Sequence, residues 1–340
     1  MHILIDAMGG DNAPEEIVRG AVTAMEAYLV DITLIGRETV LRPLLDEYNA
    51  DKDHIHIVNA DEVVTMEDDP ATAVRRKKNS SMAVMLRMLA DGEGDACVSA
   101  GSTGALLSGA TLTVKRVRGI RRACFAPVIP NGDKGVVLAD CGANSECTAE
   151  YLLQFAYMGS FYAKTMLGSE SPRVGLLNIG AEESKGTELQ KAANELLKAA
   201  DAEGRIRYVG NVESSELFSD RVDVLVSDGF TGNILLKSIE GTARFLMKQL
   251  KNVFYHSTKN KLAALLVKED MQGLKSLLDA GEVGGTPLLG ISKPVIKAHG
   301  SSDARAIRSA IRQAIQYADS GMITLIERNI DAMRLDTKEA

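Results

Sequence analysis

Glycine-rich polar turns are the segments of this chain whose residue types and spacing suit chemistry. The first places Gly9 and Gly10 ahead of Asp11, directly after a short apolar run. The second, at residues 99–105, sets hydroxyl side chains between two glycines at the start of a helical pattern. Free backbone N–H groups at a helix start bind anions, and the helix dipole strengthens that binding. The second turn therefore predicts a site for an oxyanion, although a tightly capped turn gives the same pattern.

Three further turns, at residues 140–144, 178–186 and 227–233, carry amides, carboxylates and hydroxyls after apolar runs. Any one of them alone is typical of a loop with a helix cap. In open α/β sheets, however, ligands bind at the carboxyl ends of the strands, where such turns lie. We therefore expect all five turns to meet along one edge of one sheet. The shared site would be polar, with positive charge from Lys185 and Lys237.

The chemistry of such a site favours direct attack by a bound anion. Phosphate is a competent nucleophile at neutral pH, so the protein has to orient it and stabilise a tetrahedral oxyanion. The sequence contains no GxSxG motif and no metal-ligand spacing of His and Cys, and we expect neither a cofactor nor a metal. His299, in a Gly/Ser-rich loop, is a candidate for proton transfer, anion binding or loop capping. A nucleophilic Cys141, next to Gly142, is the alternative mechanism.

The elements that position these turns follow an α/β rhythm. Short apolar runs alternate with amphipathic segments of helical length, which predicts a three-layer α/β/α fold around a largely parallel, buried sheet. The expected strands are residues 2–6, 32–36, 54–58, 95–99, 135–139, 173–178, 206–209 and 223–227. The expected helices are residues 14–29, 38–48, 80–91, 102–116, 147–167, 185–200 and 231–253.

The C-terminal third departs from this rhythm. Residues 231–280 have helical periodicity and no strand pattern, and a Gly/Pro-rich loop is expected at 281–300 before a last helix at about 303–329. No linker or internal repeat divides the chain. We therefore expect a single α/β domain spanning residues 1–340, with a helical protrusion at about 240–282.

Composition excludes several classes of protein. The net charge of −7 argues against a nucleic-acid binder, and 4% aromatic residues with no Trp argue against a base-stacking surface. The four cysteines lack CxxC spacing, which is typical of reduced, buried thiols. The N-terminus reaches Asp6 without a basic segment, so we expect a first strand there rather than a signal peptide. A cytoplasmic protein is the expectation.

An apolar run between lysines, at residues 259–268, suggests contact with a membrane surface. It is far too short to span a bilayer. Its apolar side chains would lie at the interface while the lysines meet anionic headgroups. A core or dimer-contact helix is the alternative. The residues expected to contact the membrane are Leu262, Leu265, Leu266 and Val267.

Eight longer motifs carry a family resemblance. They are DAMGGDNAP at 6–14, RRKKNSSM at 75–82, SAGSTGALL at 99–107, ADCGAN at 139–144, VGLLNIGAEESKG at 174–186, SDGFTGNILLKSIEG at 227–241, GGTPLLG at 284–290 and IKAHGSSDARAIRSAI at 296–311. These segments resemble the phosphate acyltransferase family of bacterial phospholipid synthesis. The match runs in order from residue 1 to about residue 315.

The resemblance implies a fold similar to the isocitrate/isopropylmalate dehydrogenase-like fold, working as a homodimer on the inner face of the cell membrane. It implies acyl-carrier protein as donor, inorganic phosphate as acceptor and an acyl-phosphate product for a membrane glycerol-3-phosphate acyltransferase. Acyl-carrier protein is acidic, so a docking patch is expected at one of two basic clusters. These clusters are Arg75, Arg76, Lys77 and Lys78, or Arg116, Arg118, Arg121 and Arg122.

For this reaction we expect the 101–104 backbone to hold phosphate, together with Lys185, and two amides to orient the acyl carbonyl. The expected catalytic residues are Lys185, Asn233, Asp228 and His299. The expected substrate-binding residues are Gly9, Gly10, Asp11, Gly101, Ser102, Thr103, Gly104, Asn144 and Lys237. The alternatives are a dehydrogenase-type oxidoreductase of the same superfamily and a membrane-associated scaffold of lipid synthesis.

Overall fold

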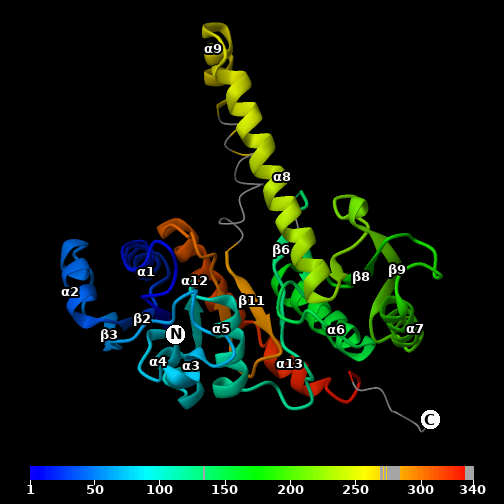
Figure 1. Cartoon of the computed structure of the whole chain (residues 1–340), viewed down its shortest axis with the longest axis horizontal. Helices are drawn as coiled ribbons and strands as arrows, with labels where there is room; N and C mark the ends of the chain where they lie inside the picture. The colour runs from blue at the N-terminus through cyan, green and yellow to red at the C-terminus, as the bar shows by residue number, and fades with distance from the viewer. Residues whose placement is uncertain (133–134, 269–270, 272, 274–283, 334–340) are drawn as a thin grey trace.

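The computed structural model describes residues 1–132, 135–268, 271, 273 and 284–333. Two sheets form two lobes, and one long helix, α8, projects away from both lobes with α9 at its far end (Figure 1). We call the part built on the seven-stranded sheet the first lobe and the part built on the five-stranded sheet the second lobe. Among the described residues, no helix combines the length and apolar character needed to cross a bilayer.

The first sheet has the strand order β3-β2-β1-β4-β12-β11-β5. Five neighbouring strands run parallel, β11 is antiparallel to β12, and β5 is antiparallel to β11. Its strands are β1 (His2–Asp6), β2 (Asp31–Gly36), β3 (Ile55–Asn59), β4 (Ala96–Ser99), β5 (Cys124–Phe125), β11 (Thr286–Leu289) and β12 (Val295–Lys297).

The second sheet has the strand order β6-β7-β10-β8-β9, parallel except for β6. Its strands are β6 (Val128–Ile129), β7 (Val136–Ala139), β8 (Arg173–Asn178), β9 (Arg207–Glu213) and β10 (Val224–Val226). The helices of both lobes are α1 (Glu15–Tyr28), α2 (Glu38–Glu47), α3 (Ala73–Arg76), α4 (Ser81–Asp91), α5 (Thr103–Gly109), η1 (Ala110–Val114), α6 (Ala149–Met166), α7 (Glu188–Ala202), η2 (Ser214–Glu216), α8 (Gly229–Tyr255), α9 (Thr258–Leu266), α12 (Ala304–Asp319) and α13 (Met322–Arg328).

Helices cover both faces of the first sheet, and the side-chain alternation of its strands shows how. Ile3 and Ile5 of β1 pack in one cluster with apolar residues of α1 and α12, whereas Leu4 packs in another with residues of α4. Because successive side chains of a strand point to opposite faces, the strand needs apolar residues at every position. This is why the parallel strands appear in the sequence as continuous apolar runs.

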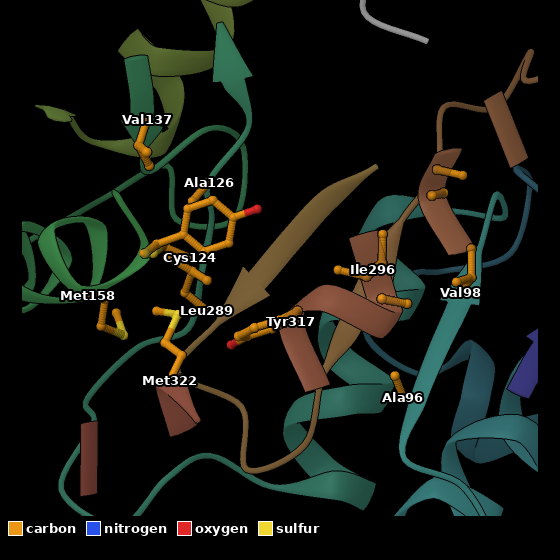
Figure 2. Packing of buried hydrophobic residues seen from close by; sticks show 14 of the residues in the cluster. Ala96, Val98, Cys124, Ala126, Val137, Met158, Leu289, Ile296, Tyr317 and Met322 are labelled. Atoms are coloured by element: carbon orange, nitrogen blue, oxygen red, sulfur yellow. The ribbon is translucent and has the colours of Figure 1, made fainter. Parts of the chain in front are cut away.

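One apolar cluster continues from the first lobe into the second. Figure 2 shows Cys124, Leu289 and Tyr317 close to Met158 and Met322, between Val98 of β4 and Val137 of β7. Tyr317 and Met158 are almost fully buried. The shared packing ties the two lobes together, so that turns on both sheets keep fixed positions.

The predicted α/β class with helices on both faces of largely parallel strands is confirmed, but three details of the prediction are wrong. There are two sheets and not one, so the five turns do not share one sheet edge. The segment 281–300, expected to be a loop, contains β11 and β12. The last helix is two helices, because Gly321 adopts a left-handed conformation (φ 66°) between α12 and α13.

The described part of the protrusion expected at about 240–282 is formed by the outer part of α8 and by α9. Helix α8 has 27 residues, and its only buried residues are Gly229 and Gly232, near its start. Residues 269–270, 272 and 274–282 of that prediction lie outside the described residues. The expectation of a single domain stays a prediction.

Candidate active site

Three turns of the first lobe meet because β1, β4 and β12 are neighbouring parallel strands with their carboxyl ends on one side. A Cβ atom on Gly9 would lie 2.8 Å from the backbone nitrogen of Gly101, so the first two turns touch. The N–H of Asp11 donates to the carbonyl of Gly300 at 2.8 Å, which joins the first turn to the third. We call these segments, 9–12, 99–104 and 297–302, the first-lobe turns.

The turn after β4 leaves backbone donors unused. Ser102 caps α5 by accepting from the N–H of Ala105, and the N–H of Gly101 donates to Ser99 Oγ. The N–H groups of Ser102, Thr103 and Gly104 have no acceptor among the described residues. Free donors at the start of a helix form an anion-binding site. The free donors that an oxyanion site at residues 101–104 requires are therefore present.

A buried lysine lies beneath these donors. Lys297, the last residue of β12, is only 9% exposed, and its ammonium group donates to the carbonyl oxygens of Ala100 and Ala298. Burial lowers the pKa of Lys297 to about 8, and the nearby carboxylates of Asp6 and Asp11 oppose that change. A cation held close to free N–H donors adds to the attraction for an anion.

Asp6, at the end of β1, is a carboxylate whose charge acts on Lys297. It is 1% exposed and accepts a 2.7 Å hydrogen bond from Ser99 Oγ. Burial raises the pKa of Asp6, while hydrogen bonds from Ser81 and Ser99 and the charge of Lys297 lower it. Asp6 thus fixes the start of the 99–104 turn and partly neutralises Lys297.

The charge of Lys237, on α8, acts on His299 in the first lobe. Burial lowers the pKa of His299, and the charge of Lys237 on α8 lowers it further, while Glu240 raises it. Glu240 pairs with Lys237 at 2.8 Å. The Nδ1 atom of His299 accepts the N–H of Ser301 at 3.2 Å, so a neutral ring carries its proton on Nε2. His299 is therefore a neutral N–H donor near neutral pH.

The turn after β7 is organised around Asp140. Its buried carboxylate accepts from the N–H groups of Phe125, Cys141, Ala143 and Asn144 at 2.7–3.3 Å. The side chain of Asn144 donates to Asp140 at 2.9 Å and to the carbonyl of Ala123 at 2.8 Å. Both amide hydrogens of Asn144 thus hold the turn together, and its expected role on an acyl carbonyl stays a prediction.

The start of α8 packs directly on this turn. Asp228 caps the helix by accepting from the N–H and the hydroxyl of Thr231, both at 2.8 Å. A Cβ atom on Gly232 would lie 2.1 Å from the carbonyl oxygen of Asp140, so only glycine fits there. Asn233 lies beside Gly142, with its Oδ1 atom 3.7 Å from the position a Cβ of Gly142 would take. Asp228 is therefore a helix cap, and Asn233 is next to the turn.

The loop that carries Lys185 is separate from the first-lobe turns. It follows β8, and the exposed ammonium group of Lys185 lies 3.9 Å from Glu182. Asn178 and Asn211 bind carbonyl groups of the same loop. No hydrogen bond or ion pair of the described residues joins this loop to the first lobe, so the expected phosphate contact of Lys185 stays a prediction.

Burial disfavours the thiolate form of the cysteines. Together with the charge of Asp140, it raises the pKa of Cys141 and of Cys147 to about 12. Burial also raises the pKa of Cys97 and of Cys124. A thiolate nucleophile needs the opposite shift, so these surroundings disfavour a cysteine nucleophile.

Lys297, Asp6 and Asp140 are the residues that the sequence-based list of site residues missed. Lys297 is a charged residue within an otherwise apolar run, PVIKA, and that mismatch was a usable signal. It was missed because the segment was assigned to a loop. Asp6 and Asp140 both directly follow apolar runs, where a carboxylate marks the carboxyl end of a strand.

The chain has close relatives over its whole length. A family model described as "Fatty acid synthesis protein" matches residues 1–325. A protein of Clostridioides difficile (strain 630) named "Phosphate acyltransferase" is 45% identical over 339 residues, which cover 99% of this chain and 98% of the relative.

Solved structures share the fold at low identity. A phosphotransacetylase from Streptococcus pyogenes is similar with a TM-score of 0.62 at 19% identity, covering 94% of both chains. A 4-hydroxythreonine-4-phosphate dehydrogenase from Klebsiella pneumoniae is similar with a TM-score of 0.54 at 12% identity, covering 94% of this chain and 99% of the other. The dehydrogenase-like fold expected from the sequence is thereby confirmed. Because the family model and the curated relative both match nearly the full length, this chain belongs to the fatty acid synthesis protein family and is an acyltransferase of the phosphate acyltransferase type.

Proposed function

We propose that this enzyme transfers a fatty acyl group from acyl-carrier protein to inorganic phosphate and releases an acyl-phosphate. One observation carries the proposal. Three unused N–H groups, at Ser102, Thr103 and Gly104, occur in the same turn region as the buried ammonium group of Lys297. This is a site for a small, multiply charged oxyanion. The name of the curated relatives, phosphate acyltransferase, supports phosphate as that anion.

In the proposed reaction, a phosphate oxygen attacks the thioester carbonyl carbon. The new C–O bond forms, the C–S bond breaks, and the proton of hydrogen phosphate ends on the released thiol. Gly9, Gly10 and Asp11 border the site beside the 101–104 donors, since a Cβ on Gly9 would already touch Gly101. His299 Nε2–H and the amide of Asn233 are the donors proposed for the carbonyl oxygen as it becomes an oxyanion.

Direct attack fits the protonation states of the site. The thiolate forms of Cys141 and Cys147 are disfavoured because burial raises the pKa of both thiols to about 12. Lys297, with its pKa of about 8, keeps its charge at neutral pH and attracts the phosphate. Lys237, across from His299, adds a second positive charge.

We propose that α8 pairs with the same helix of a second subunit in a homodimer. Exposed apolar side chains follow α8 outward, including Phe245, Leu246, Val253 and Tyr255, each more than half exposed. An isolated helix that exposes such residues to water would bury them against a partner. Glutamate at Phe245 and Leu246 is expected to give monomers by light scattering, whereas a dimer that persists in the folded double variant would contradict the pairing.

We propose further that α9, at the far end of α8, contacts the inner face of the cell membrane, where a membrane glycerol-3-phosphate acyltransferase would take up the product. Leu262, Leu265 and Leu266 are 64–81% exposed on this short helix (Figure 1). L262E with L266E is expected to abolish binding to anionic vesicles. L29E is the control, because Leu29 is 84% exposed in the first lobe. Unchanged vesicle binding by the folded double variant would contradict the contact.

The proposed reaction is tested with purified protein, long-chain acyl-carrier protein and phosphate. Thiol release and acyl-phosphate formation are expected together, and only when phosphate is present. Thiol release at the same rate without phosphate would indicate hydrolysis, and no release at all would exclude the reaction. Formation of a stable acyl-enzyme before phosphate is added would exclude direct attack.

A further inference from the structure

A groove between the two lobes has not yet been assigned a ligand. Its volume is about 440 Å³. One wall is formed by Leu107, Ser108 and Thr111 of α5 and η1, in the first lobe. The other wall is formed by Ala143 and Asn144, in the turn that Asp140 organises. The groove therefore lies between two rigid elements that both border the candidate active site.

The helical wall of the groove starts at that site and continues to the surface. Helix α5 starts at Thr103, whose free N–H belongs to the proposed phosphate site, and continues through η1 to Val114. At the rise of an α-helix, Thr103 and Leu112 are about 14 Å apart along the axis. Leu112 lines the groove and is 62% exposed. An extended ligand lying along this wall would have one end at the phosphate site and the other in solvent.

Two arginines mark the outer end of the groove. Arg116 and Arg122 line it, and Arg118 and Arg121 are exposed next to them. None of the four guanidinium groups forms an ion pair within the described part of the chain. The guanidinium group of Arg122 lies 5.6 Å from the centre of the Tyr151 ring, and Arg116 donates to the carbonyl of Arg121. Both side chains are thus held in place with donors to spare.

We propose that this groove binds the phosphopantetheine arm of the carrier-bound acyl donor, with the phosphodiester of the arm at Arg116 and Arg122. The assignment rests on the proposed function, which supplies the thioester. From phosphorus to sulfur the arm has about 13 bonds, the equivalent of about four peptide residues, and so spans about 15 Å when extended. That length matches the path along α5, and it places the thioester beside the 101–104 donors.

The lining has the chemistry that such an arm requires. Arginine binds phosphodiesters through paired N–H donors. The hydroxyls of Ser108 and Thr111 and the carboxylate of Glu146 can bind the amide and hydroxyl groups of the arm, while Leu112, toward the arginine end of the wall, suits the two methyl groups next to the phosphodiester. Arginine, then an apolar side chain, then hydroxyls along the wall correspond to the order of groups in the ligand.

The positive surface extends beyond the groove, which favours a carrier protein as the source of the arm over a free coenzyme. Arg75 and Arg76 are exposed on α3, and α3 packs against α5. Together with Arg118 and Arg121 they place positive charge on both sides of the outer end. An acidic carrier would be attracted by this surface and oriented with its arm toward the groove.

The matched variants for the test are Arg122→Ala and Arg308→Ala. Arg308 also lies 5.6 Å from an aromatic ring, that of Tyr28, so its substitution removes the same kind of packing far from the groove. The measurement compares kcat/KM for a long-chain acyl-carrier protein with kcat/KM for the same acyl group on N-acetylcysteamine, which has no phosphodiester. Arg122→Ala is expected to lower the ratio of the two values at least tenfold and Arg308→Ala to leave it unchanged. Arg122→Lys is expected to give an intermediate ratio.

Binding of 4′-phosphopantetheine and of pantetheine, measured by calorimetry, separates this proposal from the proposed reaction. Wild-type protein is expected to bind the phosphorylated form more tightly, and Arg122→Ala or Arg116→Gln is expected to remove that preference.

An unchanged preference in both variants would overturn the groove assignment even if acyl transfer to phosphate is found. A loss of activity confined to the carrier donor, with acyl-coenzyme A unaffected, would assign the arginines to the protein surface of the carrier and also overturn it. If preference for the phosphorylated arm depends on Arg122 but no acyl transfer occurs, the groove assignment stands and the proposed reaction fails.

Discussion

Each lobe buries one aspartate at the carboxyl end of a strand, and the two carboxylates have different surroundings. Asp140 in the second lobe accepts four backbone N–H groups and one side-chain amide, so the donors of its turn are used within the protein. Asp6 in the first lobe accepts mainly from serine hydroxyls, with one backbone N–H, that of Met8, at 3.4 Å, and lies near Lys297, while the N–H groups of Ser102, Thr103 and Gly104 stay unused. The second-lobe turn is therefore a rigid support, and the first-lobe turns have donors available for a ligand.

The same difference appears in the glycines. Gly229 and Gly232 let α8 pack on the Asp140 turn, where a Cβ atom would collide with backbone atoms. Gly9 and Gly101 bring two first-lobe turns together, next to Lys297. Glycine serves packing between elements in one lobe and assembly of a binding site in the other.

The largest effect is expected from a substitution that disturbs the packing of α8 on the Asp140 turn. Gly232→Ala places a methyl group 2.1 Å from the carbonyl oxygen of Asp140, and the overlap is expected to destabilise the protein by about 3 kcal/mol or more. Gly241→Ala, further along α8, meets no atom within 4 Å and is expected to stabilise it by about 0.5–1 kcal/mol, because alanine favours helix. Urea unfolding of both variants checks this. Similar stabilities for the two would mean that α8 does not pack on Asp140 as described.

The next effect concerns the ligand site. Lys297→Met is expected to lower kcat/KM for phosphate about 100-fold, comparable to loss of an oxyanion donor. Because burial lowers the pKa of Lys297 to about 8, the wild-type value should fall as pH rises above about 8, when the ammonium group loses its proton. The variant should lack this decline. Lys293→Met, near the other end of the same strand, is the control, and an equal loss there would remove the special role of Lys297.

Asparagine substitutions at Asp140 and Asp6 test whether one carboxylate mainly supports the fold and the other mainly affects phosphate binding. Asp140→Asn leaves several buried N–H groups with a poorer acceptor and is expected to cost about 2 kcal/mol of stability. Asp6→Asn is expected to cost less stability, since the Ser99 hydroxyl can rotate to a new partner, and to affect phosphate kinetics more through Lys297. Thermal unfolding and phosphate titrations measure both. The reverse order of stabilities would contradict the assigned roles.

The smallest expected effect distinguishes two lysines. Lys237→Ala is expected to lower activity about tenfold, because Lys237 lies near His299 and Lys297 but is exposed and screened by salt. Lys185→Ala is expected to change activity less than about threefold, because the Lys185 side chain is exposed and next to Glu182. A larger loss for Lys185→Ala would restore the phosphate contact expected from the sequence.

Local sequence patterns predicted the strands whose own residues show the pattern of a buried strand. Strands β1 and β8 match the expected ranges to the residue, because apolar side chains on both faces of a buried parallel strand give an uninterrupted run. Strand β12 was not predicted, because it has three residues, follows Pro294 and is stabilised by pairing with β4 from a distant part of the chain. Such pairing leaves no local pattern.

The site was predicted in its turns but not in its arrangement. The 9–11 and 101–104 segments were recognised because glycine and hydroxyl residues at a helix start have few other uses. Assignment of the five turns to two different sheets depends on strand order, which composition does not reveal. Lys297 was missed for the same reason, since its burial follows from the position of β12 inside the first sheet.

A structure of the enzyme with phosphate bound tests the contrast between the lobes most directly. We expect phosphate within hydrogen-bonding distance of the N–H groups of Ser102, Thr103 and Gly104, with the ammonium group of Lys297 close by. Phosphate bound instead at the Asp140 turn, or on Lys185 without contact to the first-lobe turns, would contradict the account.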